Sequence, residues 1–121
     1  MDLKSLLLDI ETLELDEIER TGRRLYKEIY LQFDAYGVLK AHDDENVFFW
    51  AKQFEHAFFT SKDRARHPED KSNLAVDRIM RIRWIEHVIA GRVESTACYK
   101  AQSPGQKKHF TNRLYVVPSE L

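Results

Sequence analysis

The sequence has one cysteine among its 121 residues, Cys98. One cysteine cannot form a disulfide within the chain, which is typical of proteins from the reducing cytoplasm, and its strand-like surroundings favour an inert core thiol over a nucleophile. The N-terminal stretch MDLKSLLLDIETL is interrupted by charged residues, unlike a secretory signal peptide. No apolar run approaches the length that crosses a membrane. We therefore expect a soluble cytoplasmic protein without a membrane partner.

The sequence also has few glycines, no metal-ligand pattern and a net charge close to zero. The four glycines are isolated from one another, so the sequence has no glycine-rich phosphate loop. No two of the five histidines have a zinc-ligand spacing, and we expect neither a metal nor a cofactor. The 19 basic and 20 acidic residues give a formal net charge of −1. This balance removes the simplest argument for nucleic-acid binding, a strongly basic domain, but it leaves room for a local basic patch.

Apolar residues are present in sufficient number for a core, at 43% of the chain with seven Phe, five Tyr and two Trp. A chain of this length is most simply one domain, residues 1–121. Apolar residues at helical spacing predict a short helix over 3–13 and a second over about 17–33. The apolar face of the second helix is formed by Ile18, Leu25, Ile29 and Phe33, with Gly22 on the same side. A polar loop at 41–46 follows this helical N-terminal part, residues 1–40.

The aromatic stretch VFFWAKQFEHAFF, residues 47–59, is predicted to be a strand. Its aromatic content and polar flanks favour strand over helix, and a polar loop at 60–72 follows it. Histidine transfers protons near neutral pH, so His56 is a candidate general acid or base. The alternative is a hydrogen-bonded histidine that packs within an aromatic core.

A broad apolar face predicts a helix over 73–90, which Gly91 is placed to end. Arg78 and Arg81 lie on the exposed side of this helix. In one interpretation they belong to an ordinary solvated face, where Asp77 and Arg81 form an i,i+4 pair. In the other they contact phosphate, which the planar donor fork of arginine suits.

Two strands, 92–100 and 110–117, are predicted to close the chain, joined by a turn that contains SPGQ. On the last strand Arg113 and Tyr115 share one face, where they could hold a phosphate and stack on a base. The alternative is a mixed face of a solvated strand. The elements together predict an α+β fold. Two N-terminal helices precede a three- or four-stranded antiparallel sheet that packs on the 73–90 helix.

The segments FEHAF, SKDR, DRIMRIRWIEHVIAGRVES and NRLYVV, in this order, resemble a family of small proteins encoded by bacteriophages, prophages and plasmids. This family is assigned to the phage branch of the barnase/EndoU/colicin/RelE-like nuclease fold. The resemblance covers roughly residues 47–117, and its pattern falls on His56, Arg78, Arg81, Trp84, Ile85, Asn112, Arg113 and Tyr115. It implies a nuclease-like α+β core over these residues and metal-independent cleavage of RNA or binding of nucleic acid. The family usually has one more strand after RLYVV, which 47–59 or a partner would supply here.

The leading hypothesis is therefore an RNase-like protein of a phage or another mobile element. The expected roles are general acid or base for His56, phosphate neutralisation for Arg113 with Arg78 or Arg81, and stacking on or positioning of the substrate for Tyr115. Lys62 and Arg64 are expected to hold the substrate backbone, and Asn112 is expected to bind substrate. The rival hypothesis is a non-catalytic accessory protein that binds a host or antitoxin-like protein. Its contact surface would be the acidic loop 43–45, the aromatic stretch and an unpaired sheet edge.

Overall fold

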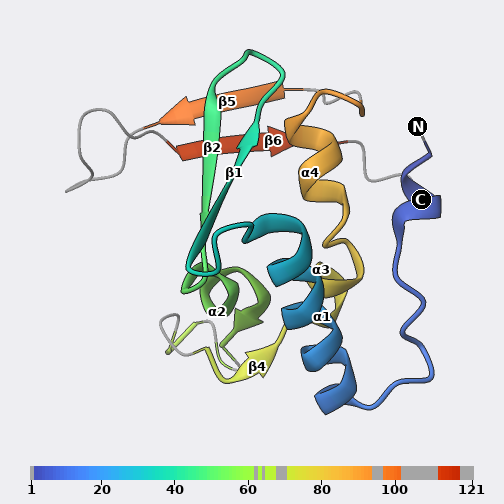
Figure 1. The fold of residues 1–121 in the computed structure, drawn as a ribbon. Helices are drawn as coiled ribbons and strands as arrows, with labels where there is room; N and C mark the ends of the chain where they lie inside the picture. The colour runs from blue at the N-terminus through green and yellow to red at the C-terminus, as the bar shows by residue number, and fades with distance from the viewer. Residues whose placement is uncertain are drawn as a thin grey trace.

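The computed structural model describes residues 2–61, 63, 65–67, 71–93, 97–101 and 112–117, which form a mixed α+β fold (Figure 1). The helices are the 3₁₀-helix η1 (Leu3–Leu6) and the α-helices α1 (Leu15–Tyr30), α2 (Gln53–Phe58), α3 (Val76–Met80) and α4 (Trp84–Ile89). The strands are β1 (Tyr36–Lys40), β2 (Asn46–Trp50), β3 (Phe59–Thr60), β4 (Asn73–Leu74), β5 (Ala97–Ala101) and β6 (Asn112–Val116). They form three separate antiparallel pairs, β1–β2, β3–β4 and β5–β6. The α+β prediction is confirmed.

The prediction of a three- or four-stranded sheet is wrong for the described part of the chain, because the expected strand over 47–59 ends early. Strand β2 stops at Trp50, and the chain turns into α2 two residues later. Phe54 and Phe58 are consistent with a strand, where alternate residues share a face, and with a helix, where residues four apart do. Both are buried while His56 between them is exposed, so the helical arrangement prevails.

Helix α1 buries the face that the sequence predicts, with Ile18 and Leu25 both in the core. Gly22 lies against Ile79 of α3, where an added Cβ would stand 3.2 Å from the Ile79 side chain. The helix ends at Tyr30, so Phe33 lies beyond it and is exposed. The prediction of a helix over 17–33 is thus correct in its face and too long at its C-terminal end.

The predicted helix over 73–90 is interrupted. Its first residues form β4, α3 ends at Met80, and a turn at 81–83 separates α3 from α4. The apolar stripe nevertheless faces the core, since Ile79 and Ile82 are fully buried and Ile89 is buried. Gly91 has a φ of +76°, a conformation that favours glycine, and it follows α4 as predicted.

The predicted helix over 3–13 is reduced to the single turn η1. Beyond η1 the segment runs along α3 and α4 (Figure 1), and the Leu8 amide donates to the Met80 carbonyl at 3.0 Å. The indole nitrogen of Trp84 donates to the Leu3 carbonyl at 3.1 Å. The N-terminal segment therefore holds Trp84 in place.

The loop predicted at Gly37 and 41–46 is instead the hairpin β1–β2, so residues 1–40 are not wholly helical. The turn between its strands is closed by a hydrogen bond from the Ala41 amide to the Glu45 carbonyl at 2.8 Å. Asp44 has a φ of +65° in this turn. Gly37 is in β1, and its backbone passes so close to the Tyr30 carbonyl that a Cβ would not fit.

The core is aromatic where α1, β2 and α2 meet. The rings of Tyr30 and Phe49 are 4.7 Å apart between centroids, and those of Phe54 and Phe58 are 4.9 Å apart. Tyr26 contacts Tyr30, Phe54 and Phe58. Within the described ranges, no helix has the length and apolar character needed to cross a membrane.

Candidate functional site

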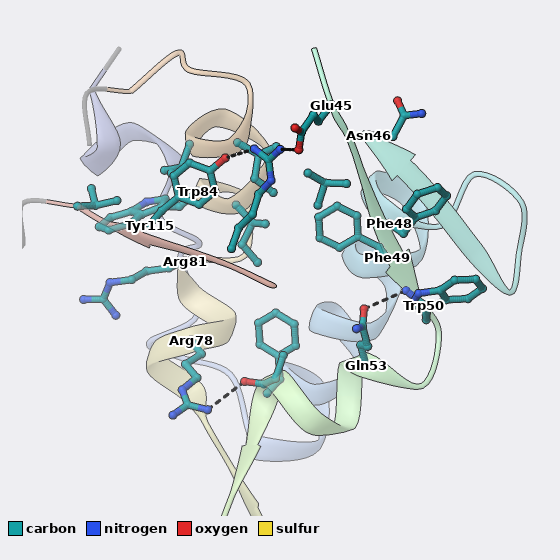
Figure 2. A pocket seen from close by; sticks show the side chains of 18 residues that line it. Glu45, Asn46, Phe48, Phe49, Trp50, Gln53, Arg78, Arg81, Trp84 and Tyr115 are labelled. Carbon is teal, nitrogen blue, oxygen red and sulfur yellow. Dashed lines mark hydrogen bonds and ion pairs between the residues drawn. The ribbon is translucent and has the colours of Figure 1, made fainter. Parts of the chain in front are cut away.

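A cleft of about 1130 Å³ separates β2 and α2 from α3, α4 and β6 (Figure 2). Its walls are formed by residues from six parts of the chain: Glu45, Asn46, Val47, Phe48, Phe49, Trp50, Gln53, Ala57, Phe58, Arg78, Arg81, Trp84, Ile85, Val88, Ile89, Arg113, Tyr115 and Val117. Strand alternation divides the β2 side chains between two faces. Phe49 points into the cleft, whereas Phe48 and Trp50 also contribute to its lining but turn their rings toward the opposite face of the hairpin (Figure 2). The cleft is thus mainly apolar at its base.

Arg78 and Arg81 occupy one side of this cleft. The Arg78 guanidinium donates to the Ala57 carbonyl at 3.1 Å, and the Arg81 guanidinium donates to the Asp77 carbonyl at 2.8 Å. The expected Asp77–Arg81 pair therefore uses the backbone of Asp77. The Arg81 guanidinium also lies 5.3 Å from the Trp84 ring centroid, a cation–π geometry. Neither arginine pairs with a carboxylate among the described residues.

Arg113 is a third arginine in the cleft wall, and it does have carboxylate partners. Its Nη2 donates to both Asp43 carboxylate oxygens at 3.1 Å and to Glu45 Oε2 at 2.6 Å. Its Nη1 donates to the Tyr115 hydroxyl at 3.1 Å. Lys100 of β5 joins the cluster through Asp43 Oδ2 at 2.7 Å and Glu45 at 3.4 Å. We call the four charged residues, Asp43, Glu45, Lys100 and Arg113, the Arg113 clamp.

The clamp shifts the pKa values of Asp43 and Lys100. Hydrogen bonds from Lys100 and Arg113 hold the pKa of the Asp43 carboxyl well below its ordinary value. The hydrogen bond that Lys100 donates to Asp43 in turn raises the pKa of Lys100. The clamp connects the turn of the β1–β2 hairpin to the β5–β6 pair, which crosses the hairpin near that turn (Figure 1).

The structure brings together four of the predicted site residues, Arg78, Arg81, Arg113 and Tyr115, which all line the cleft. His56 does not line it. Gln53 and Ala57 face the cleft from α2, while His56 is exposed and points about 100° away from Ala57 around the helix axis.

The other three predicted residues have side chains that the structure does not describe. Asn112 lies in β6 opposite Ala101. Lys62 and Arg64 lie outside the described residues. The role of His56 as a general acid or base stays a prediction, as do the substrate contacts of these three residues.

The sequence analysis did not predict the Arg113 clamp, and it named Trp84 only as part of the family pattern. Asp43 and Glu45 belong to the acidic loop that the rival hypothesis assigns to a protein contact, yet in the structure their carboxylates bind Arg113 and Lys100. Opposite charge was the available signal, but Asp43 and Arg113 are 70 residues apart, beyond any local pattern. Cys98, predicted in the core, is only half-buried opposite Tyr115.

No group of three or more histidine, cysteine, aspartate or glutamate side chains among the described residues is arranged to hold a metal ion. No known protein family, curated protein or solved structure matches this chain.

Proposed function

We propose that this protein binds single-stranded RNA in the cleft beside α3 and α4. The observation that supports this most directly is the pair Arg78 and Arg81, which line a mainly apolar cleft and have no carboxylate partner among the described residues, with the Arg81 guanidinium beside the Trp84 ring. Arginine forks bind phosphate oxygens, and aromatic rings stack on bases without regard to sequence. Arginine therefore suits the phosphates of a polynucleotide, and tryptophan suits its bases.

The size and charge of the cleft are compatible with a polynucleotide strand. Its volume of about 1130 Å³ is at the upper end of ligand pockets, which enclose about 300–1,000 Å³. The charge of Glu45 is offset by Arg113, which leaves the charges of Arg78 and Arg81 along one wall. A near-neutral protein can bind a polyanion when its positive charge is gathered in this way.

RNA cleavage is an additional proposal that follows from the resemblance to nucleases. In metal-independent cleavage the ribose 2′-oxygen attacks phosphorus and the 5′-oxygen leaves with a proton, which yields a 2′,3′-cyclic phosphate and a 5′-hydroxyl. Tyr115 and Arg113 line the cleft, and His56 is on the same helix as three cleft-lining residues. Binding does not depend on this step, so the two proposals can be tested separately.

The binding proposal is tested by titrating a short fluorescent single-stranded RNA with the wild type and with Arg78→Ala/Arg81→Ala. We expect the variant to bind at least about tenfold more weakly, because it no longer offers charge-assisted hydrogen bonds to phosphate. The slope of log Kd against log salt should also fall by about 0.7 for each phosphate that the variant no longer neutralises. The control is Arg20→Ala/Arg24→Ala, an equal charge change on the exposed face of α1. Equal affinities of the two variants would contradict the proposal.

The two tryptophans locate the ligand, because both line the cleft but the Trp50 ring is turned toward the other face of the β1–β2 hairpin (Figure 2). Trp50→Phe retains only the emission of Trp84, and Trp84→Phe retains only that of Trp50. RNA bound in the cleft should quench the fluorescence of Trp50→Phe strongly and that of Trp84→Phe weakly.

The second candidate function, binding of a host protein, is favoured by exposed aromatic rings on that other side. Phe33 and Tyr36 have ring centroids 5.0 Å apart, and Tyr36 and Trp50 have centroids 5.5 Å apart. Phe33 and Trp50 are 60% and 44% exposed. A protein ligand on this face would change the emission of Trp50, with little dependence on salt, and would leave Trp84 unaffected.

A further inference from the structure

Arg113 differs from the other two cleft arginines in one respect, the carboxylates that cover it. All three guanidinium groups line the same cleft. Arg78 and Arg81 donate to backbone carbonyls, whereas Arg113 donates to three carboxylate oxygens and its side chain is only 8% exposed. Carboxylate and phosphate oxygens are the two acceptors that the arginine fork binds best. The carboxylates therefore occupy donors that a phosphate in the cleft would use.

The carboxylates come from a different part of the chain from Arg113. Asp43 and Glu45 belong to the turn of the β1–β2 hairpin, and Arg113 belongs to β6. Glu45 lines the cleft and its side chain is 59% exposed, so water and solutes reach its contact with Arg113. Figure 2 shows Glu45 and Tyr115 on opposite sides of the cleft, joined through the guanidinium between them.

We infer that Asp43 and Glu45 act as an internal competitor that keeps a third phosphate subsite, at Arg113, closed. This inference rests on the proposed function, since Arg113 lines the same cleft as Arg78 and Arg81. The subsite opens when the two acidic side chains rotate away from Arg113. The backbone of the turn stays anchored by the hydrogen bond from the His42 amide to the Ile89 carbonyl at 2.8 Å. Lys100, which shares both carboxylates, is released at the same time.

The test compares RNA binding by the wild type, Asp43→Asn/Glu45→Gln, and Asp43→Asn/Glu45→Gln/Arg113→Gln. We expect the double variant to bind single-stranded RNA about tenfold more tightly, the effect of one added charge-assisted hydrogen bond. The slope of log Kd against log salt should steepen by about 0.7 for each additional phosphate that is bound. The triple variant should show neither change, because the subsite no longer contains a guanidinium.

The control variant is Asp44→Asn, which removes one charge from the same turn without touching the clamp. Asn tolerates the left-handed conformation of Asp44, whose φ is +65°. Two outcomes would show that the effect is only a general reduction of negative charge, and either would overturn the inference. In the first, the affinity gained for each charge removed is the same in Asp44→Asn and in the double variant. In the second, the triple variant still binds more tightly than the wild type. Unchanged affinity and slope in the double variant overturn it as well.

Each variant is first checked for native near-ultraviolet circular dichroism. Should the double variant fail to fold, Glu45→Gln alone decides the matter, because it removes the charge of the exposed carboxylate that accepts the shortest hydrogen bond of Arg113, at 2.6 Å. Failure of the inference is distinguishable from failure of the proposed function. In the first case wild-type binding still depends on Arg78 and Arg81, and in the second the Arg78→Ala/Arg81→Ala variant binds like the wild type.

Discussion

The hydroxyl of Tyr30, at the end of α1, donates a hydrogen bond to the Ile82 carbonyl at 2.5 Å and accepts one from the Glu86 amide at 3.1 Å. Ile82 lies in the turn between α3 and α4, and Glu86 lies in the first turn of α4. One buried hydroxyl thus satisfies two backbone groups where the helix is interrupted. This interaction sets the start of α4 and with it the position of Trp84 in the cleft.

Removal of that hydroxyl should destabilise the protein. Tyr30→Phe leaves a buried carbonyl and an amide without their partner, and we expect a loss of about 2–3 kcal/mol in the free energy of unfolding. Urea denaturation followed by circular dichroism measures it. The matched control is Tyr36→Phe, a partly exposed tyrosine whose ring packs on Phe33 and Trp50, for which we expect a change below about 0.5 kcal/mol. Equal losses in both variants would contradict the role of the Tyr30 hydroxyl.

Gly37 is predicted to be required for a steric reason. A Cβ at this position would collide with the Tyr30 carbonyl oxygen and lie 2.6 Å from the carbonyl carbon, and backbone atoms cannot rotate away as a side chain can. We expect Gly37→Ala to cost about 3 kcal/mol. Gly22→Ala is the comparison, because its Cβ would meet only the Ile79 side chain at 3.2 Å and alanine is the better helix former. It should remain within about 1 kcal/mol of the wild type. Thermal and urea unfolding of both variants test the difference.

The spacing of apolar residues predicted those parts of the fold in which it fits either a helix or a strand but not both. The buried face of α1 follows from Ile18, Gly22 and Leu25 at helical spacing, and the pairing of the last two strands follows from their alternation and turn. Phe54 and Phe58 are compatible with both periods, and only their burial against Tyr26 decides for a helix. Short apolar runs leave this choice open.

Tertiary contacts decided the remainder. The interruption of the predicted 73–90 helix depends on Tyr30, which is 52 residues from Ile82. The neutralisation of Arg113 depends on the turn of a hairpin where the sequence pattern predicts a loop. Arg78, Arg81, Arg113 and Tyr115, which the sequence analysis named as candidate site residues, line one cleft. Their contacts with a substrate stay a prediction.

Tyr26 should make the stability depend on alkaline pH. Burial raises the pKa of Tyr26 to about 12, and its hydroxyl donates to the Trp50 carbonyl at 2.9 Å. A tyrosine with a raised pKa in the folded state contributes stability that is complete below its unfolded pKa of about 10 and is lost as the pH rises toward the folded value. We expect Tyr26→Phe to be less stable than the wild type at pH 7, by about 1 kcal/mol for the missing hydrogen bond. This difference should shrink between about pH 10 and pH 12. Urea unfolding at a series of pH values measures it, and a constant difference would contradict the assignment.

His56 provides the test of catalysis as distinct from binding. Because His56 is exposed on α2 and does not line the cleft, His56→Ala should bind single-stranded RNA with the affinity of the wild type. If His56 moves the proton of the ribose 2′-hydroxyl, the variant should also lose at least about 100-fold in the rate of cleavage, the contribution typical of a general acid or base. The assay uses purified protein in a chelator, with detection of 2′,3′-cyclic phosphate ends.

The matched control for that assay is His67→Ala, another exposed histidine outside the cleft-lining residues. Cleavage that persists in His56→Ala and in His67→Ala alike would assign the chemistry to other groups. Tyr115 and Arg113 would be the next residues to change, because they line the cleft and their side chains are 3.1 Å apart. If the wild type binds RNA without cleaving it, the cleft remains an RNA-binding site and the catalytic role of His56 is contradicted.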